Sequence, residues 1–132
     1  MKTYKQLKAE HQAEMNKFEG IFFAFNVEQF YAKLQEMNCS EADVTRLFAG
    51  GFILKSRVKA YLAMTDRQKK EMSALKKDTK ALKDALTYEL NNHEYCYTCD
   101  VKPALDALNL KKEDVPTAVL NAAIKATYKE AC

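Results

Sequence analysis

The stretch DRQKKEMSALKKDTKALKDALTYELN, residues 66–91, decides how this chain folds. Its apolar side chains recur every three, four or seven positions, at Met72, Leu75, Leu82, Leu86 and Leu90. This spacing places them on one face of an α-helix and leaves lysines and acids on the other faces. The pattern therefore predicts one long helix from about Asp66 to Asn91, where asparagine tolerates the left-handed conformation that ends helices.

Shorter helices are predicted on both sides of this long helix. The composition favours them, because Ala, Leu, Lys and Glu are abundant while the chain has only three Gly and two Pro. Capping residues and stop signals place these helices at about residues 3–17, 26–37, 40–48, 56–65, 103–108 and 114–128. The segment Thr65-Asp66-Arg67-Gln68 resembles a capping box, so a break or bend is expected there.

Two short apolar runs, IFFAF at residues 21–25 and FILK at 52–55, are too short for helices and suit buried strands. We expect them to pair as a two-stranded antiparallel sheet covered by helices, since such a ribbon is marginal alone. The aromatic residues around them are assigned to the core: Phe22, Phe23, Phe25, Phe30, Phe48 and Phe52.

The predicted fold is thus mainly α with a minor two-stranded antiparallel β element, an α+β arrangement. A chain of 132 residues fits one domain, so residues 1–132 are expected to form a compact helical single domain around one long helix. The chain is 48% apolar and 30% charged, as in ordinary globular proteins.

The first twenty residues predict the cellular compartment, and the compartment predicts the redox state of the cysteines. That polar, amphipathic start lacks the apolar run of an export signal, and no apolar run approaches the length needed to cross a bilayer. The expected location is the cytoplasm, with no membrane partner. The cysteines, at positions 39, 96, 99 and 132, are therefore expected to be reduced thiols.

Positive charge is concentrated in one segment. Between Lys55 and Lys83 there are ten Lys and Arg against three Asp and Glu, although the whole chain carries only +3. Such a split can indicate an anionic partner, and it can equally be a solvated helix face. A nucleic-acid-binding module that uses the basic face of residues 55–83 stays an alternative, although no known nucleic-acid-binding motif matches.

The stretch NHEYCYTCD, residues 92–100, is the densest in chemically active side chains. His93, Cys96 and Cys99 form H-x2-C-x2-C, whose spacing suits zinc but which lacks an evident fourth ligand. Glu89 and His93 stand four apart, so a helix reaching that far would let the carboxylate orient the imidazole, with Glu94 nearby, for acid–base chemistry. The third interpretation is a polar network that satisfies the end of the long helix. We favour it, because no partner nucleophile or phosphate-binding loop is visible.

Several segments together resemble a known family. They are YKQLK at 4–8, FFAFN at 22–26, AGGFI at 49–53, and YELNNHEYCYTCD at 88–100 followed by ALDAL at 104–108. The chain resembles a family of small uncharacterised proteins from bacteriophages and mobile elements of gut bacteria. The resemblance implies a bacterial host cell and no assigned activity. Small phage proteins often bind host machinery, which raises the expectation of a binding role by analogy.

The function expected from the sequence is that of a non-enzymatic, phage- or mobile-element-encoded binding protein acting on a host protein. No cofactor is expected, and the oligomeric state is left open. The alternatives are a small metal-binding protein or enzyme that uses the His93, Cys96 and Cys99 segment, and the nucleic-acid module. The predicted binding surface consists of Asn92, His93, Glu94, Tyr95, Tyr97 and Asp100 together with Lys69, Lys76 and Lys80.

Overall fold

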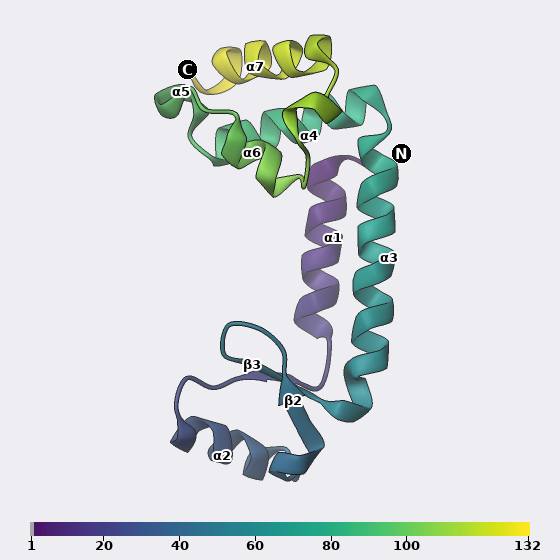
Figure 1. Cartoon of the computed structure of the whole chain (residues 1–132), viewed down its shortest axis with the longest axis vertical. Coiled ribbons are helices and arrows are strands. Elements are labelled where there is room, and N and C mark those ends of the chain that lie inside the picture. The colour runs from purple at the N-terminus through teal and green to yellow at the C-terminus, as the bar shows by residue number, and fades with distance from the viewer. Residues whose placement is uncertain (1) are drawn as a thin grey trace. The chain divides into compact units, whose positions relative to one another are not determined.

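The computed structural model describes residues 2–132, which are mainly α-helical with a small three-stranded antiparallel sheet (Figure 1). The helices are α1 (Tyr4–Lys17), α2 (Val27–Glu36), α3 (Val58–Lys76), α4 (Thr79–Asn92), α5 (Tyr95–Thr98), α6 (Lys102–Ala107) and α7 (Thr117–Ala131). The strands are β1 (Ile21–Phe23), β2 (Val44–Arg46) and β3 (Gly51–Leu54), and 3-10 turns cover Glu41–Asp43, Lys55–Arg57 and Lys112–Asp114. The prediction of a mainly α fold is confirmed.

The chain divides into two compact units. The terminal unit contains the residues up to His11 together with Lys69–Cys132, and the middle unit contains Gln12–Gln68. The expectation that residues 1–132 form one domain stays a prediction, because two compact units can still unfold in one cooperative transition.

The terminal unit has its core on α4. Ala85, Leu86 and Leu90 of this helix are fully buried, and so is Ala123 of α7, which packs against it. Helix α6 covers α4 as well, and the start of α1 adds Tyr4 to the same cluster. The apolar face read from the sequence between Leu75 and Leu90 is therefore the main packing surface of this unit.

The long helix predicted from Asp66 to Asn91 is wrong in one respect, because the structure has two helices there. Helix α3 ends at Lys76 and α4 begins at Thr79. Asp78 has an extended backbone, and its side-chain Oδ1 accepts the N–H of Ala81 at 2.9 Å. The apolar spacing continues across the break, since Leu75 and Leu82 are seven residues apart, so periodicity alone does not reveal it.

The break expected at Thr65-Asp66 is absent. Helix α3 runs through both residues without interruption. The hydroxyl of Thr65 donates to the carbonyl of Leu62 at 3.1 Å, which satisfies this polar side chain inside the helix. A sequence that resembles a capping box is therefore accommodated within a helix here.

Replacing Asp78 with alanine is expected to lower the free energy of unfolding by about 1 kcal/mol, the usual cost of losing an N-cap side chain. Urea unfolding followed by circular dichroism measures the change. Asp66→Ala is the matched control, because Asp66 is exposed inside α3 and alanine favours helix there. An Asp78→Ala variant as stable as this control would contradict the capping role.

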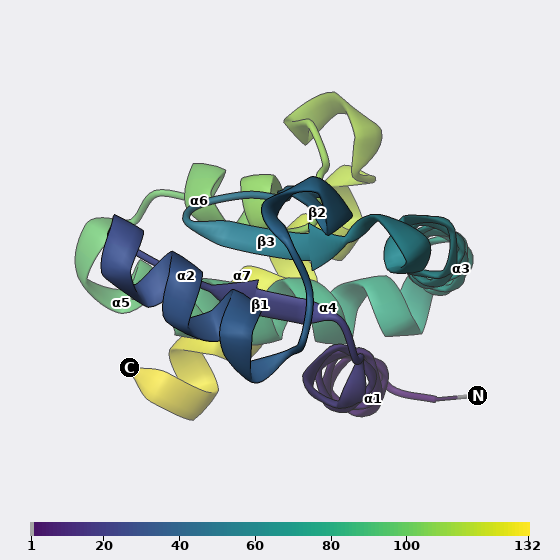
Figure 2. The same ribbon diagram turned by 90° about the horizontal axis from the view of Figure 1, so that it is seen from below.

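The middle unit is built on a sheet with the strand order β1-β3-β2. Antiparallel pairing places Phe22 opposite Phe52, and Arg46 of β2 opposite the same Phe52. Helix α2 lies across one face of this sheet (Figures 1 and 2), where Phe30 is 4.8 Å from Phe52 between ring centroids. The predicted pairing of residues 21–25 with 52–55 is confirmed, but the sheet has a third strand.

The third strand replaces the helix predicted over residues 40–48. Its cap forms as expected, with the Ser40 N–H donating to Asp43 Oδ2 at 2.9 Å, but only one 3-10 turn follows. Val44 and Thr45 then pair with β3. Both are β-branched residues, which pack well on a pleated surface, and the pairing partner lies beyond the reach of local signals.

Candidate functional site

Several aromatic side chains that the sequence assigned to the core lie at the surface of the middle unit. Phe25 is 77% exposed and Phe48 is 54% exposed, and Phe23 is about half exposed. Phe22 is buried, as predicted, and Phe30 and Phe52 are partly buried. The core assignment is therefore wrong for half of this cluster. Alternation along β1 explains Phe23, because consecutive strand residues point to opposite faces.

Five exposed apolar side chains of the sheet and α2 are here called the aromatic surface: Phe23, Phe25, Val27, Tyr31 and Phe48. Phe23 and Phe48 contact each other edge to face at 6.1 Å. Phe23 and Phe25 line one shallow hollow of about 400 Å³. Phe25 also lines a larger pocket together with Val27 and Tyr31, so it joins the two hollows.

The larger pocket has a volume of about 570 Å³. Its walls come from α2, from the link between β1 and α2, and from all three residues of β2. Two charged residues border it. Glu41 accepts a hydrogen bond from the hydroxyl of Tyr31 at 3.1 Å, and this bond raises the pKa of Tyr31. Arg46 forms no ion pair with any carboxylate of residues 2–132.

The position of Phe25 is fixed by its neighbours. Its own N–H donates to Gln29 Oε1 at 2.9 Å, while the Asn26 side chain caps α2 by accepting the N–H of Gln29. The turn at Gly50 lies against the ring of Phe25, and a Cβ at position 50 would come within 2.8 Å of that ring. Gly50 also has a φ of +82°, which favours glycine. These contacts hold Phe25 in its place.

The predicted segment 92–100 is a tight connection in the terminal unit. Asn92 ends α4, and the N–H of His93 donates to the carbonyl of Glu89 at 2.9 Å. Glu94 and Cys99 have left-handed backbone conformations on either side of the one-turn helix α5. The segment is therefore a short connection between α4 and α6, as the sequence predicted.

The side chains of this segment do not converge on one point. Tyr95 is buried and contacts the ring of Tyr128 at 5.9 Å, whereas Tyr97 is 86% exposed. Asp100 is exposed, and its carboxylate accepts the N–H of Lys102 at the start of α6 at 3.0 Å. Tyr95 therefore belongs to the core, and Tyr97 is the only large apolar side chain that residues 92–100 expose.

Glu89 forms the centre of a buried polar cluster. It is 1% exposed, and its Oε1 accepts hydrogen bonds from Tyr4 Oη at 2.6 Å and from Lys8 Nζ at 2.9 Å. Its Oε2 lies 3.3 Å from His93 Nε2, as the spacing of four predicted. The ammonium group of Lys8 also lies over the ring of Tyr88, 5.1 Å from its centroid.

Charge and burial act in opposite directions on this cluster. Burial raises the pKa of the Glu89 carboxyl, but the hydrogen bonds from Tyr4 and Lys8 outweigh it, and the net pKa lies below its usual value. Burial and the bond to Glu89 raise the pKa of Tyr4. Two donors come from α1, so the cluster ties the start of α1 to α4. The predicted bonding of terminal helix carbonyls by Asn92 and His93 stays a prediction.

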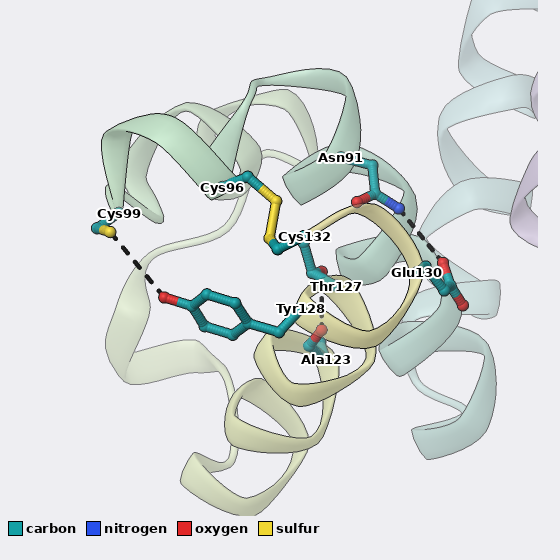
Figure 3. The surroundings of a disulfide bond; sticks show 8 residues. All are labelled: Asn91, Cys96, Cys99, Ala123, Thr127, Tyr128, Glu130 and Cys132. Atoms are coloured by element: carbon teal, nitrogen blue, oxygen red, sulfur yellow. Dashed lines mark hydrogen bonds between the residues drawn. A yellow bond between two sulfur atoms is a disulfide. The ribbon is translucent and has the colours of Figure 1, made fainter.

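A disulfide joins Cys96 of α5 to Cys132, with 5.7 Å between the Cα atoms (Figure 3). The prediction of four reduced cysteines is therefore wrong, because only Cys39 and Cys99 are free thiols. The partners are 36 residues apart in sequence, so no local spacing indicates the bond. Cys99 lies 4.0 Å from the hydroxyl of Tyr128, and this contact raises the pKa of Tyr128.

The disulfide bears on the zinc hypothesis. Cys96 cannot act as a thiolate ligand beside His93 and Cys99 while it is bonded to Cys132. Among residues 2–132, no group of three or more His, Cys, Asp or Glu side chains is arranged to hold a metal ion.

The three predicted lysines have different surroundings. Lys69 and Lys80 are exposed. Lys76 donates to the carbonyl of Leu108 at 2.7 Å and so satisfies the end of α6. Lys69 and Lys76 both line a hollow of about 390 Å³ beside Leu108. Binding of an anion by this face stays a prediction.

Comparison with known proteins identifies a family but no activity. A family model described as a family of unknown function (DUF7659) matches residues 3–132. No curated protein and no solved structure matches the chain. None of the helices in residues 2–132 has the length and apolar character that crossing a membrane requires.

Proposed function

We propose that this chain, which belongs to the DUF7659 family of unknown function, is a non-enzymatic binding protein that acts on a host protein. The proposal includes a bacteriophage or mobile element as the source and the bacterial cytoplasm as the setting. The observation that carries it is the aromatic surface of the middle unit, with its pocket of about 570 Å³.

Exposure of this kind favours a protein partner. Monomeric soluble proteins rarely leave large apolar side chains next to one another at the surface, although single exposed ones are common. Phe, Tyr and Arg are also the side chains that protein interfaces concentrate at their centres. Phe25, Tyr31 and Arg46 surround one pocket here. Phe25 is already held by Gln29 and Gly50, so a partner would have little ordering left to do.

The surface predicted around Asn92–Asp100 and the lysines offers less to a protein partner. Tyr95 is buried and Lys76 is engaged by Leu108, which removes two of its members. The metal, enzyme and nucleic-acid alternatives stay predictions. For the enzyme, Glu89 is enclosed by Tyr4 and Lys8, so a substrate would have to displace donors that hold α1 in place.

The cytoplasmic setting is compatible with the aromatic surface. Glutathione and thioredoxin can reduce disulfides in the cytosol, so the aromatic surface should not depend on the Cys96–Cys132 bond. Both cysteines belong to the terminal unit, and the aromatic surface belongs to the middle unit. Binding is therefore expected to continue when the disulfide is reduced.

Affinity capture from a lysate of a gut bacterium tests the proposal. The wild-type chain should retain a specific protein, identified by mass spectrometry, and Phe25→Ala should lose most of it because the most exposed ring of the aromatic surface is gone. Tyr97→Ala is the matched control, since Tyr97 is an equally exposed aromatic in the terminal unit. Circular dichroism confirms that both variants fold. Capture that Phe25→Ala leaves intact, or that Tyr97→Ala abolishes, would contradict the proposal.

A further inference from the structure

We propose that the pocket receives an extended, acidic segment of the partner protein, which adds to β2 as a fourth strand. An apolar side chain of that segment would occupy the pocket, and a carboxylate beside it would contact Arg46. This inference rests on the proposed function and specifies how the partner is recognised.

The backbone of β2 is open on one side. In the order β1-β3-β2, strand β2 is an edge strand, and all three of its residues line the pocket. The N–H of Leu47, the next residue along, donates to the carbonyl of Gly51 at 2.9 Å. In an antiparallel pair, backbone groups alternate between facing the partner strand and facing away. Positions 45 and 47 therefore face β3, and positions 44 and 46 face away.

Three of the four outward backbone groups of Val44 and Arg46 are available for pairing. The N–H of Val44 already donates to the carbonyl of Glu41. The carbonyl of Val44 and both backbone groups of Arg46 have no backbone partner within residues 2–132. An edge of this kind is where extended peptides add to a sheet through main-chain hydrogen bonds. One added residue that pairs with Arg46 would satisfy its N–H and its carbonyl together.

The pocket lies on the sheet face toward which alternate side chains of an added strand would point. Val44 and Arg46 point to the sheet face that carries Phe52 and is covered by α2, whereas Thr45 points to the other face. Alternate side chains of an added strand would follow the same face. There they would meet Phe25 and Tyr31, which favour an apolar side chain.

The charge of Arg46 indicates that the ligand carries a carboxylate. The carboxylate of Glu41 is engaged by Tyr31, and Arg46 has no carboxylate partner in the described chain. A guanidinium group beside an apolar wall binds a carboxylate through two parallel hydrogen bonds better than it binds a neutral group. Because Arg46 and the pocket lie on the same face of the sheet, the structure favours a segment in which an apolar and an acidic residue stand two positions apart.

Three synthetic octapeptides test this inference against the full-length protein. The first carries an apolar residue (phenylalanine or valine) and glutamate in turn at every second position, with threonine between them, so that both side-chain types share one face. The second has lysine in place of each glutamate, and the third is the acidic peptide with alternate backbone amides N-methylated. Amide chemical shifts of the ¹⁵N-labelled protein report binding. The acidic peptide should shift the amides of Val44 and Arg46 and bind at least tenfold more tightly than the other two. Arg46→Glu should reverse the preference between the first two peptides, whereas Lys59→Glu, at an exposed position of α3, should not.

The outcomes separate this inference from the proposed function. Equal binding of the acidic and lysine peptides, unchanged binding after N-methylation, or shifts at Arg46 that depend on protein concentration alone would each overturn it. The last result would show a second copy of the chain on β2. If the captured host protein still requires Phe25 while these peptides fail, the proposed function stands and strand addition is wrong. If the peptides bind as expected while capture ignores Phe25, strand addition stands and the proposed function is wrong.

Discussion

Reducing the Cys96–Cys132 disulfide is expected to lower the free energy of unfolding by about 4 kcal/mol. The bond closes a loop with a sequence separation of 36 residues, and constraining an unfolded chain over that length gives an entropic stabilisation of this size. The loop contains α6 and α7, which pack on the core helix α4. Reduction therefore gives these segments more conformational freedom in the unfolded state. Urea unfolding with and without dithiothreitol, followed by circular dichroism, measures the loss.

Two cysteine variants identify the source of this loss. Cys132→Ser should be as unstable without reductant as the reduced wild type, and reductant should change it little. Cys99→Ser is the matched control, because Cys99 is an exposed free thiol only three residues from Cys96. It should behave as the wild type in both conditions. A wild-type midpoint that does not change with reductant would contradict the stabilising role of the bond.

Replacing Glu89 with alanine is expected to lower the free energy of unfolding by about 2–4 kcal/mol. The variant loses two hydrogen bonds to a charged acceptor, each worth about 1.5–3 kcal/mol, and leaves the buried hydroxyl of Tyr4 without its partner. Part of this loss is offset because the carboxylate no longer has to be desolvated. Lys8 is half exposed and can return to water, which limits the cost further.

A double-mutant cycle with Tyr4→Phe isolates the bond between the two buried groups. Tyr4→Phe removes the donor, so Glu89→Ala should cost less in that background than in the wild type. Asp84→Ala is the matched control, because Asp84 is an exposed acid on the same helix, and its loss should be nearly neutral. Additive effects of Tyr4→Phe and Glu89→Ala would show that the two groups do not interact.

The same cluster predicts how stability depends on pH. The pKa of Glu89 is lowered on folding, so its contribution is present above the unfolded pKa of about 4.3 and is lost as pH falls through the folded value. The pKa of Tyr4 is raised, so its contribution is present below about pH 10 and is lost as pH rises beyond that. Glu89→Gln should flatten the acid limb of the stability curve, and Tyr4→Phe the alkaline limb. Unchanged limbs would contradict the cluster.

The helical fold could be predicted because most of its signals are local. The apolar spacing on α4, the Asn26 cap of α2 and the proline at the start of α6 each act within one or two turns. The third strand could not be predicted in this way. Residues 44–46 follow a valid helix cap, and only pairing with β3 makes them a strand. The break before α4 could not be predicted from periodicity, because Asp78 interrupts the helix without disturbing the apolar repeat.

The candidate sites likewise differ in whether local sequence signals or long-range packing determine them. The contact between Glu89 and His93 follows from a helical spacing of four, so the sequence could predict it. The disulfide depends on the packing of α7 near α5, which brings Cys132 to Cys96 across 36 residues. Hydrophobicity gives no direction to a side chain, which is why the core assignment is wrong for Phe23, Phe25 and Phe48. Alternation on β1 does place Phe22 and Phe23 on opposite faces, and that signal could have been used.

The dissociation constant of the purified complex with the captured host protein tests the central claim most directly. Phe25 stands at the junction of both hollows of the aromatic surface, so Phe25→Ala should weaken binding about 30-fold, the effect of a residue that contributes about 2 kcal/mol at an interface. Tyr97→Ala should leave the constant unchanged. Equal affinities of wild type and Phe25→Ala, with Tyr97→Ala weakened instead, would contradict binding through the middle unit.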